Sequence, residues 1–514
     1  MRILGVLSIL VLSAGAAAQD DPLAGFDSFV EQALVDWNVP GASVAIVRGG
    51  KVVLARGYGV RRVASDDPVD ERTLFPIGST TKAFTSALIG TLVSEGRMSW
   101  DDPVVRHLPW FRLSDGWTTE RVTVRDLLCH RTGLPAQAST WLGIAFGYPR
   151  REQVERLRFL EPAHPFRSVW AYENTMFIAA GLAAESAGGE SWDDLLRTRL
   201  LLPLDMVSTG SRDAEFRAAT NRVAGHALLD GEPREVELVS LDDAGGPAGA
   251  VFSNAADMGN WLRFQLSDGS FEGRRVVDPE VLAEMHSPQI EGKDPASRFE
   301  NADPSFLGYG LAWLVHDQAG QRVIRHEGKT LGTTTAVVLL PGAGAGLVVL
   351  ANEFDAMGFH ASVANRFIDA CAGLPPTDRS ASERARREAG AGSFDSPRRV
   401  PGTKPSLPLA FYAGTYRSDL WGDVRVTAGP AGLAITLGPA ATRIDLEPWH
   451  FDTFMGTWRM AVPFATPVSF GLSIEGRVER LSIGGLVGDL VRVPGAATSP
   501  APVLDVHVHA PSPE

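Results

Sequence analysis

The sequence predicts an α+β protein with an antiparallel sheet, followed by a small all-β barrel. Residues 22–374 show strand-like patterns near both ends and helical patterns in the middle, which is typical of an α+β domain. Residues 375–405 are rich in proline, arginine, serine, glycine and alanine, and are predicted to be a linker. Short strand-like runs separated by glycine-containing turns then occupy 406–493, which favours a barrel, with a sandwich as the alternative. A chain of 514 residues is long enough for two such units.

Residues 1–18 have the pattern of a secretory signal peptide. One positive charge at Arg2 precedes the apolar run Ile3–Leu12, and small residues lead to a cleavage site after Ala18. An uncleaved membrane anchor is the alternative, but the run is shorter than the ~20 residues that a span needs. We therefore expect a secreted or periplasmic protein without stable membrane insertion after cleavage.

Within the first unit, strand and helix patterns follow one another in a definite order. A hairpin is predicted from the strand-like Ala42–Arg48, the turn Gly49-Gly50 and the strand-like Val52–Val60. A strand-to-helix transition follows over Leu74–Glu95. The later elements are helices and then strands, namely helices Asn174–Ser186 and Ala255–Leu266, and strands Arg322–His326, Thr333–Leu340 and Leu347–Asn352.

In the C-terminal part the patterns are short. A possible short helix, Ala381–Ala389, interrupts the predicted linker. The all-β unit is predicted to contain strands Val424–Thr427, Leu433–Leu437, Phe470–Ile474 and Val478–Ile483. The aromatic residues between them are expected to pack in its core rather than line a ligand pocket; these are Trp449, Phe451, Phe454 and Trp458. The proline- and alanine-rich tail, 494–514, is expected to be disordered.

Composition and charge exclude several classes of function. The formal net charge is −13, which argues against nucleic-acid binding because phosphate binding needs clustered Lys and Arg. The two cysteines, Cys129 and Cys371, are too few for a disulfide framework, and whether they pair is left open. The sequence lacks the short signatures of zinc, phosphate-loop and nucleophile-elbow enzymes, and His507-x-His509 lies in the tail. We therefore expect no metal and no cofactor.

A Ser-x-x-Lys pair at the start of a predicted helix is the first candidate for chemistry. Ser79 falls in the first turn and Lys82 three residues later, so both side chains lie on one face. A serine hydroxyl needs a base to become a nucleophile, and a buried lysine can be that base, whereas arginine stays protonated. Only five of the 48 basic residues are lysines. The spacing also arises by chance, and would then be a helix cap followed by a solvated lysine.

Two later motifs supply partners for this pair. Tyr172-Glu173-Asn174 stands just before a predicted helix, which directs a phenol that can relay protons and an amide toward a common cleft. An isolated tyrosine would instead be interpreted as a packed core residue. His326-Glu327-Gly328 ends a predicted strand, where the glycine lets the strand edge approach a substrate. The next N–H, that of Lys329, can complete an oxyanion hole.

In this order the three motifs resemble those of the serine β-lactamase and penicillin-binding superfamily, in its class C and S12-peptidase-like branch. Two further stretches, 122–134 and 247–253, are similar to the same branch. The resemblance covers about residues 25–370 and includes His130, which we interpret as structural support. The all-β unit resembles the lipocalin-like domain that many such hydrolases carry.

The resemblance implies a five-stranded antiparallel sheet flanked by helices beside a mostly helical domain, with the active site between them. It also implies acyl-enzyme catalysis, in which Ser79 attacks a carbonyl while Lys82 and Tyr172 move protons. Asn174 would hold the substrate, and the backbone N–H groups of Ser79 and Lys329 would stabilise the oxyanion. The implied partner is a small-molecule or peptide-like substrate.

One departure from the family pattern bears on the substrate. Class C β-lactamases have Lys-Thr-Gly where this chain has His326-Glu327-Gly328, and a neutral histidine lacks the fixed charge of that lysine. Glu173 adds negative charge and favours the same conclusion. We therefore predict a serine hydrolase that cleaves an ester or a peptide-like amide. A class C-like β-lactamase or D,D-peptidase is the first alternative, and a catalytically silent penicillin-binding-type interaction protein is the second.

Overall fold

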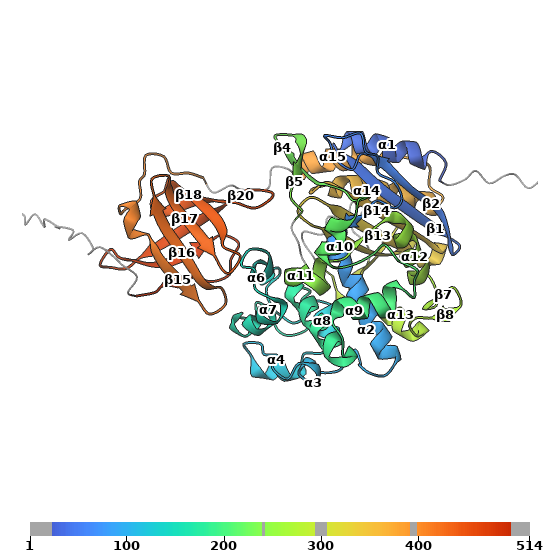
Figure 1. The fold of residues 1–514 in the computed structure, drawn as a ribbon, viewed down its shortest axis with the longest axis horizontal. Helices are drawn as coiled ribbons and strands as arrows, with labels where there is room; N and C mark the ends of the chain where they lie inside the picture. Colours follow the sequence, from blue (N-terminus) through green and yellow to red (C-terminus); the bar gives the residue numbers. More distant parts are fainter. Residues whose placement is uncertain (1–22, 239–241, 293–305, 391–397, 495–514) are drawn as a thin grey trace, which may run out of the picture.

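The computed structural model describes residues 23–238, 242–292, 306–390 and 398–494. Figure 1 shows a mixed α+β unit and, beside it, a β-barrel. The predicted signal peptide, most of the predicted disordered tail and His507-x-His509 lie outside the described residues. Within them, no helix is both long and apolar enough to cross a membrane.

The centre of the first unit is an eight-stranded antiparallel sheet with the order β2-β1-β14-β13-β12-β11-β10-β9. Five of its strands agree with the predicted ones: β2 (Lys51–Gly59), β1 (Gly41–Arg48), β14 (Ala345–Ala351), β13 (Thr334–Leu340) and β12 (Gln321–Lys329). The hairpin β1–β2 pairs with β14 in the register Val44↔Val349. The two ends of the unit therefore build one sheet, and the predicted fold class is confirmed.

The sheet has three more strands than the five that the family resemblance implies. β11 (Leu314–Gln318), β10 (Leu307–Tyr309) and β9 (Ile290–Glu291) extend it beyond β12. Runs of two to five residues have too few positions to show the alternation that marks a strand. They are strands because each finds hydrogen-bonding partners on its neighbour: β11 on the edge of β12, β10 on β11, and β9 on β10. The expected strand count was wrong for this reason.

Helices cover both faces of the sheet, and alternate residues of β14 belong to two different cores. Leu347 and Val349 pack with α1 (Phe26–Asp36) and α14 (Met357–Cys371). Val348 and Leu350 belong to the larger core, with α12 (Ala255–Gln265) on this face. The helix predicted within the linker is α15 (Arg379–Gly390), and it packs against α14 through the ion pair between Arg379 and Asp369.

The larger core continues into the helical part. α2 (Thr81–Ser94) runs through its centre and is buried from Thr81 to Leu92, with α8 (Asn174–Gly188) beside it. Shorter helices surround this pair: α3 (Val104–His107), α4 (Gly116–Arg121), α5 (Val124–Leu128), α6 (Thr140–Ile144), α7 (Arg150–Arg156), α9 (Trp192–Leu196), α10 (Asp213–Ala218), α11 (Asp242–Gly249) and α13 (Pro279–Met285). Three small strand pairs complete the unit: β3 (Phe75–Pro76) with β6 (Phe252–Ser253), β4 (Gly225–Leu229) with β5 (Glu232–Val236), and β7 (Ser270–Phe271) with β8 (Arg274–Arg275).

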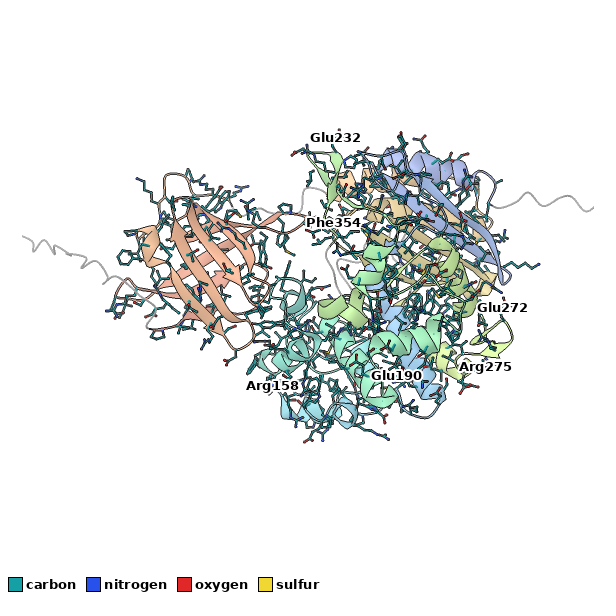
Figure 2. All side chains as sticks on the ribbon, in the orientation of Figure 1. Arg158, Glu190, Glu232, Glu272, Arg275 and Phe354 are labelled. Carbon is teal, nitrogen blue, oxygen red and sulfur yellow. The ribbon has the colours of Figure 1, made fainter. Side chains whose placement is uncertain are left out.

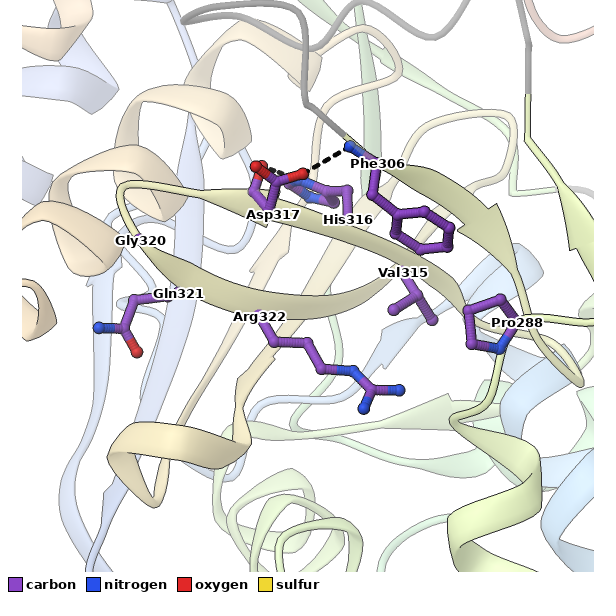
Figure 3. A pocket seen from close by; sticks show the side chains of 8 residues that line it. All are labelled: Pro288, Phe306, Val315, His316, Asp317, Gly320, Gln321 and Arg322. Carbon is purple, nitrogen blue, oxygen red and sulfur yellow. Dashed lines mark hydrogen bonds between the residues drawn. The ribbon is translucent and has the colours of Figure 1, made fainter.

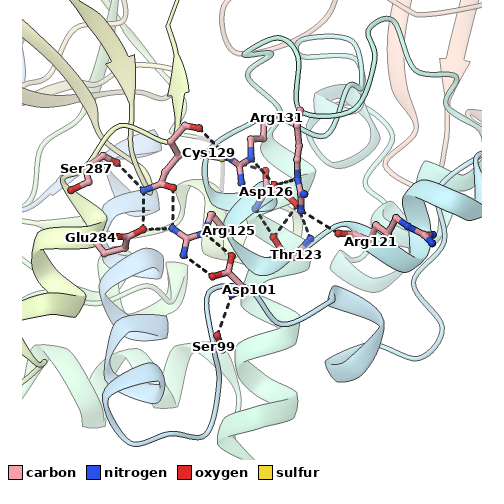
Figure 4. A network of polar contacts seen from close by, with 12 residues as sticks. Ser99, Asp101, Arg121, Thr123, Arg125, Asp126, Cys129, Arg131, Glu284 and Ser287 are labelled. Carbon is pink, nitrogen blue, oxygen red and sulfur yellow. Dashed lines mark hydrogen bonds and ion pairs between the residues drawn. The ribbon is translucent and has the colours of Figure 1, made fainter.

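A polar network holds the 122–134 stretch around α5 (Figure 4). The buried carboxylate of Asp126 pairs with Arg131 at 2.6 Å and with Arg167 at 2.7 Å. It also accepts the backbone N–H of Thr123, which closes a capping box at the start of α5. Because a buried charge without partners is costly, these bonds tie the helix firmly to its surroundings. The stretch therefore delivers His130, just beyond α5, to a defined position.

The C-terminal unit is a closed eight-stranded antiparallel barrel, as predicted, so the sandwich alternative is excluded. Its strands are β15 (Gly414–Ser418), β16 (Gly422–Gly429), β17 (Gly432–Leu437), β18 (Thr442–His450), β19 (Thr453–Trp458), β20 (Phe464–Leu472), β21 (Val478–Ile483) and β22 (Leu490–Arg492). Aromatic side chains fill the interior, and Phe454 and Trp458 are fully buried there. Trp449 is only half-buried, and Phe451 is 55% exposed.

Candidate active site

Ser79 lies in a tight turn that leads into α2. Gly78–Thr80 form one turn of 3-10 helix (η1), and the N–H of Ile77 donates to the carbonyl oxygen of Val251 at 2.9 Å. Gly78 has a φ of 52°, and a Cβ at this position would lie 2.6 Å from the backbone nitrogen of Lys329, so only glycine fits. Ser79 is partly exposed between buried neighbours. Its hydroxyl is therefore accessible and held in place.

Lys82 is completely buried, and its ammonium nitrogen has three polar contacts. Nζ lies 3.1 Å from Ser79 Oγ, 2.7 Å from Asn174 Oδ1 and 2.9 Å from the carbonyl oxygen of Ala248. The ring centroid of Tyr172 is 4.7 Å away. Ala248 belongs to the 247–253 stretch, which the sequence marked only by family resemblance. The contact between its carbonyl oxygen and Lys82 was not predicted, because a backbone contact with a helix far away in the sequence has no local sequence signal.

The three contacts of Lys82 suit it to act as a base. Burial lowers the pKa of Lys82 well below its usual value, and the opposing effect of Glu173 is smaller. A neutral amine has two N–H groups and one lone pair, and the carbonyl oxygens of Asn174 and Ala248 can only accept. Their contacts therefore use both N–H groups, which leaves the lone pair for the hydroxyl of Ser79. This arrangement can withdraw the serine proton.

The Tyr172-Glu173-Asn174 motif is held by a segment that the sequence did not single out, Gln137–Thr140. The N–H of Gln137 donates to the carbonyl oxygen of Tyr172 at 2.7 Å. Ser139 donates to the carboxylate of Glu173 from its hydroxyl at 2.7 Å and from its N–H at 3.2 Å. Asn174 Nδ2 donates to Thr140 Oγ1 at 2.9 Å, which turns Asn174 Oδ1 toward Lys82. Each residue of the motif therefore has its own partner in this segment.

Tyr172 is placed to give a proton rather than to take one. Burial raises the pKa of its phenol, a hydrogen bond with Ser79 lowers it by less, and Glu173 raises it. The phenol is therefore neutral at pH 7, and it is hydrogen-bonded to the hydroxyl that would attack a substrate. Lys82 in its neutral form, and not the neutral phenol of Tyr172, is therefore the stronger base in the resting site.

Glu173 is buried rather than facing an open cleft. Burial raises the pKa of its carboxyl to about 7, against the hydrogen bonds from Ser139. The expectation that Glu173 presents negative charge to a substrate is therefore revised: its side chain is bonded to Ser139, and it acts on the electrostatics of Lys82 from within the protein. The charge of Glu173 attracts the protonated form of Lys82 and so raises the pKa of that lysine.

Glu173→Gln is expected to move the acid limb of the pH–activity profile to lower pH, because the ionised carboxylate of Glu173 raises the pKa of Lys82. The base works above the pKa of Lys82 and is lost as the pH falls through it; without the Glu173 charge that pKa is lower. The measurement is kcat/KM between pH 5 and 9. Glu190→Gln, an exposed carboxylate just beyond α8, is the matched control and should not move the profile. An acid limb that stays in place or moves upward would show that Glu173 does not influence Lys82.

The end of β12 brings His326, Gly328 and Lys329 to the same site. A Cβ on Gly328 would lie 1.9 Å from the carbonyl oxygen of Ile77, so the strand edge lies directly against the turn of Ser79. The backbone nitrogen of Lys329 lies close to Gly78, the residue just before Ser79. The side chain of Lys329 is engaged elsewhere: its Nζ is 3.6 Å from Asp355 and 3.8 Å above the ring of Phe354, which Figure 2 places on the barrel-facing side.

Two buried histidines complete the surroundings of Lys82. Burial, together with the smaller effects of the Lys82 and Arg325 charges, lowers the pKa of His326 to about 3, so its ring is neutral. His326 Nε2 lies 3.3 Å from the hydroxyl of Tyr309. Burial likewise lowers the pKa of His130, whose Nδ1 accepts the N–H of Glu173 at 3.1 Å. That bond fits the structural role predicted for His130.

A pocket of about 450 Å³ lies away from this site, on the hairpin of β11 and β12 (Figure 3). Its lining is formed by Pro288, Phe306, Val315, His316, Asp317, Gly320, Gln321 and Arg322, none of which contacts Ser79 or Lys82. Among the described residues, no group of three His, Cys, Asp or Glu side chains is arranged to hold a metal ion. Cys129 and Cys371 are both free thiols.

The fold and this site define a serine hydrolase. Residues 26–370 match the family described as Beta-lactamase, and residues 398–489 match a domain of unknown function (DUF3471). The first match covers more than half of the chain, so the chain belongs to the Beta-lactamase family. The predicted family resemblance is thereby confirmed, and the chain is an enzyme.

Named relatives and solved structures are consistent with this placement. Unguisins hydrolase ungD' of Aspergillus campestris is 30% identical over 77% of this chain and 76% of its own, and ungD of Aspergillus violaceofuscus is 29% identical over 91% and 90%. Protein flp of Staphylococcus aureus is 25% identical over 65% and 64%. The octameric penicillin-binding protein homologue from Pyrococcus abyssi has a TM-score of 0.60 at 21% identity, and covers 92% of this chain and all 100% of that chain.

Proposed function

We propose that this enzyme cleaves an ester or a peptide-like amide through an acyl-enzyme intermediate on Ser79. The observation that carries the proposal is the environment of Lys82 Nζ, which lies 3.1 Å from Ser79 Oγ while both of its other contacts are carbonyl oxygens. A buried neutral lysine with its lone pair directed at a serine hydroxyl is an activated nucleophile pair. The hydrolase relatives support a hydrolytic reaction.

In acylation, the proton of Ser79 passes to Lys82 as Oγ forms a bond to the substrate carbonyl carbon. The negative charge that develops on the carbonyl oxygen meets the backbone N–H groups of Ser79 and Lys329. As the tetrahedral intermediate collapses, the bond to the leaving group breaks. The neutral phenol of Tyr172 gives its proton to the leaving group and is reprotonated with the proton held by Lys82.

Deacylation repeats the sequence with water. Lys82, neutral again, accepts a proton from the water that attacks the ester carbonyl, and the same two N–H groups stabilise the charge. The carboxylic acid leaves, and Ser79 recovers its proton. Asn174 keeps Lys82 in place throughout, because its Oδ1 accepts from Nζ at 2.7 Å.

The neutral ring of His326 favours ester or amide substrates over β-lactam antibiotics. A β-lactam drug carries a carboxylate, which the lysine in the corresponding class C motif helps to bind. His326 cannot supply this charge because its pKa is lowered to about 3. The side chain of Lys329 does not replace it, since it is engaged with Asp355 and Phe354.

The proposal is tested by treating the folded protein with a fluorophosphonate and mapping the adduct by mass spectrometry. A single adduct is expected on Ser79, because only this hydroxyl faces a neutral lysine among the described residues. Ser79→Ala should carry no adduct, and Ser86→Ala, which removes a buried hydroxyl from the same helix, should label like the wild type. Folded wild-type protein that stays unlabelled would overturn the proposal in favour of a catalytically silent interaction protein.

The rates of hydrolysis of different substrates then show whether the enzyme prefers an ester, an amide or a β-lactam bond. p-Nitrophenyl esters and peptide amides, including those of D-amino acids, are expected to be hydrolysed faster than nitrocefin. The comparison is made through kcat/KM for each substrate. Efficient nitrocefin turnover without esterase or peptidase activity would identify a β-lactamase instead.

A further inference from the structure

The barrel packs against the short segment that begins with α6. Figure 1 shows α6 and α7 on the side of the first unit nearest the barrel. The ring of Trp141 in α6 stacks on Trp458 at 5.1 Å and on Phe464 at 5.6 Å. Further along, the hydroxyl of Tyr148 donates to the carbonyl oxygen of Trp421 at 2.9 Å. Trp458 is fully buried, so its ring is barrel core as well as contact surface.

The same segment reaches the active site from its other side. Trp141 follows Thr140 directly in the chain, and Thr140 Oγ1 accepts the amide of Asn174 at 2.9 Å. Thr140 Oγ1 itself donates to Gln137 Oε1 at 2.8 Å, so its lone pairs are left to accept from Asn174. Two consecutive residues therefore make the aromatic contact with the barrel and the hydrogen bond that orients Asn174, a partner of Lys82.

We infer that the barrel positions the catalytic amide of Asn174 by holding α6 in place. The inference rests on the proposed function. Trp141 and Thr140 are positioning residues in this arrangement: the barrel rings Trp458 and Phe464 hold Trp141, and Thr140 keeps Asn174 Oδ1 turned toward Lys82 Nζ at 2.7 Å. In this arrangement the barrel supports the active site by fixing the position of α6, and it does not need to bind a ligand to do so.

α6 needs contacts with the rest of the protein because it is too short to be stable as an isolated helix. α6 has only five residues, and a helix of this length is not stable by itself in water. Its position depends on tertiary contacts, of which the stacked rings of Trp141, Trp458 and Phe464 are the largest on the barrel side. A shift of about 1 Å in a positioning group costs up to roughly a hundredfold in rate. Loss of the Trp141 contact would therefore let α6 shift and, through Thr140, change the orientation of the Asn174 amide.

Trp141→Ala tests the inference, with Trp141→Phe as the conservative variant. We expect Trp141→Ala to lower kcat and the rate of fluorophosphonate labelling at Ser79 by about 10- to 100-fold, with KM changed by less than about twofold. Trp141→Phe keeps a stacking ring and should restore most of the rate. Trp117→Ala, at a 56% exposed tryptophan on α4, is the matched control and should behave like the wild type. Melting curves show whether each variant is folded.

A double variant separates positioning from substrate binding. Thr140→Val removes the nearer of the two acceptors of the Asn174 amide and leaves Gln137 Oε1 at 3.3 Å. Adding Trp141→Ala to it should cost little more than Thr140→Val alone, because both act through the bond between Thr140 and Asn174. Phe464→Ala, made on the barrel side, should reproduce the loss of Trp141→Ala even if the latter does not fold. Additive losses, or a loss confined to KM for substrates with large apolar groups, would overturn the inference and mark the rings as a substrate subsite. Wild-type protein that does not label at Ser79 would instead count against the proposed function.

Discussion

Replacing Lys82 by arginine is expected to lower the rate of acylation of Ser79 by at least about 10³-fold, although both side chains are basic in water. The guanidinium stays protonated and has no lone pair for the proton of Ser79. Complete burial lowers the pKa of the wild-type Lys82 amine well below its usual value and so favours its neutral form, and its two carbonyl partners leave the third position for Oγ. The measurement is the pre-steady-state rate of acylation, or the rate of fluorophosphonate labelling.

The control for this variant must separate loss of the base from loss of the fold. Lys51→Arg, at an exposed position at the start of β2, makes the same change of side chain and should leave the rate unaltered. Because a permanently charged group in the Lys82 position is costly to bury, Lys82→Met supplies a neutral, folded comparison and should be equally inactive. Acylation at the wild-type rate in folded Lys82→Arg would exclude Lys82 as the base.

Gly328→Ala is expected to lower kcat/KM by about 10²- to 10³-fold and to reduce the melting temperature. The added methyl group would lie 1.9 Å from the carbonyl oxygen of Ile77, so the end of β12 has to move away from the turn of Ser79. That movement separates the N–H of Lys329 from the N–H of Ser79 and weakens the oxyanion site. Both N–H groups belong to the main chain, so a change of side-chain rotamer cannot restore their positions.

Gly342→Ala provides the matched control for this second variant. Gly342 lies between β13 and β14 at the far end of the same sheet, and a Cβ there meets its nearest atom, Gln321 Oε1, at 3.8 Å. Its activity and melting temperature should stay close to those of the wild type. If Gly328→Ala melts lower but keeps wild-type kcat/KM, the N–H of Lys329 does not stabilise the oxyanion.

The main elements of the fold were predictable because their signals are local. The strands β1, β13 and β14 are long and apolar, and the helices α8 and α12 show their period within one window of sequence. The short strands β9 to β11 were missed because they depend on pairing in turn with one another and, through β11, with β12. Likewise, the closed barrel was predictable as a class, but several of its strands were not.

For the site, the sequence predicted which residues to consider but not how they meet. Ser79 and Lys82 are neighbours on one helix, so their distance follows from helical geometry. The contacts of Lys82 with Asn174 and Ala248 cross 92 and 166 residues of chain, and no local pattern encodes them. The segment Gln137–Thr140 carries no motif, yet it orients the whole second motif.

The sequence by itself determined the class of fold, the order of the three motifs and the nucleophile and base to test. The class of fold follows from periodicity and composition, which act over a few residues at a time, whereas the motif order and the choice of nucleophile and base follow from the family resemblance. Only the tertiary structure decided the lowered pKa of Lys82, the burial of Glu173 and the contact between the barrel and α6. Burial, desolvation and long-range hydrogen bonds depend on what the rest of the chain brings near a group, and they exist only once the chain has folded.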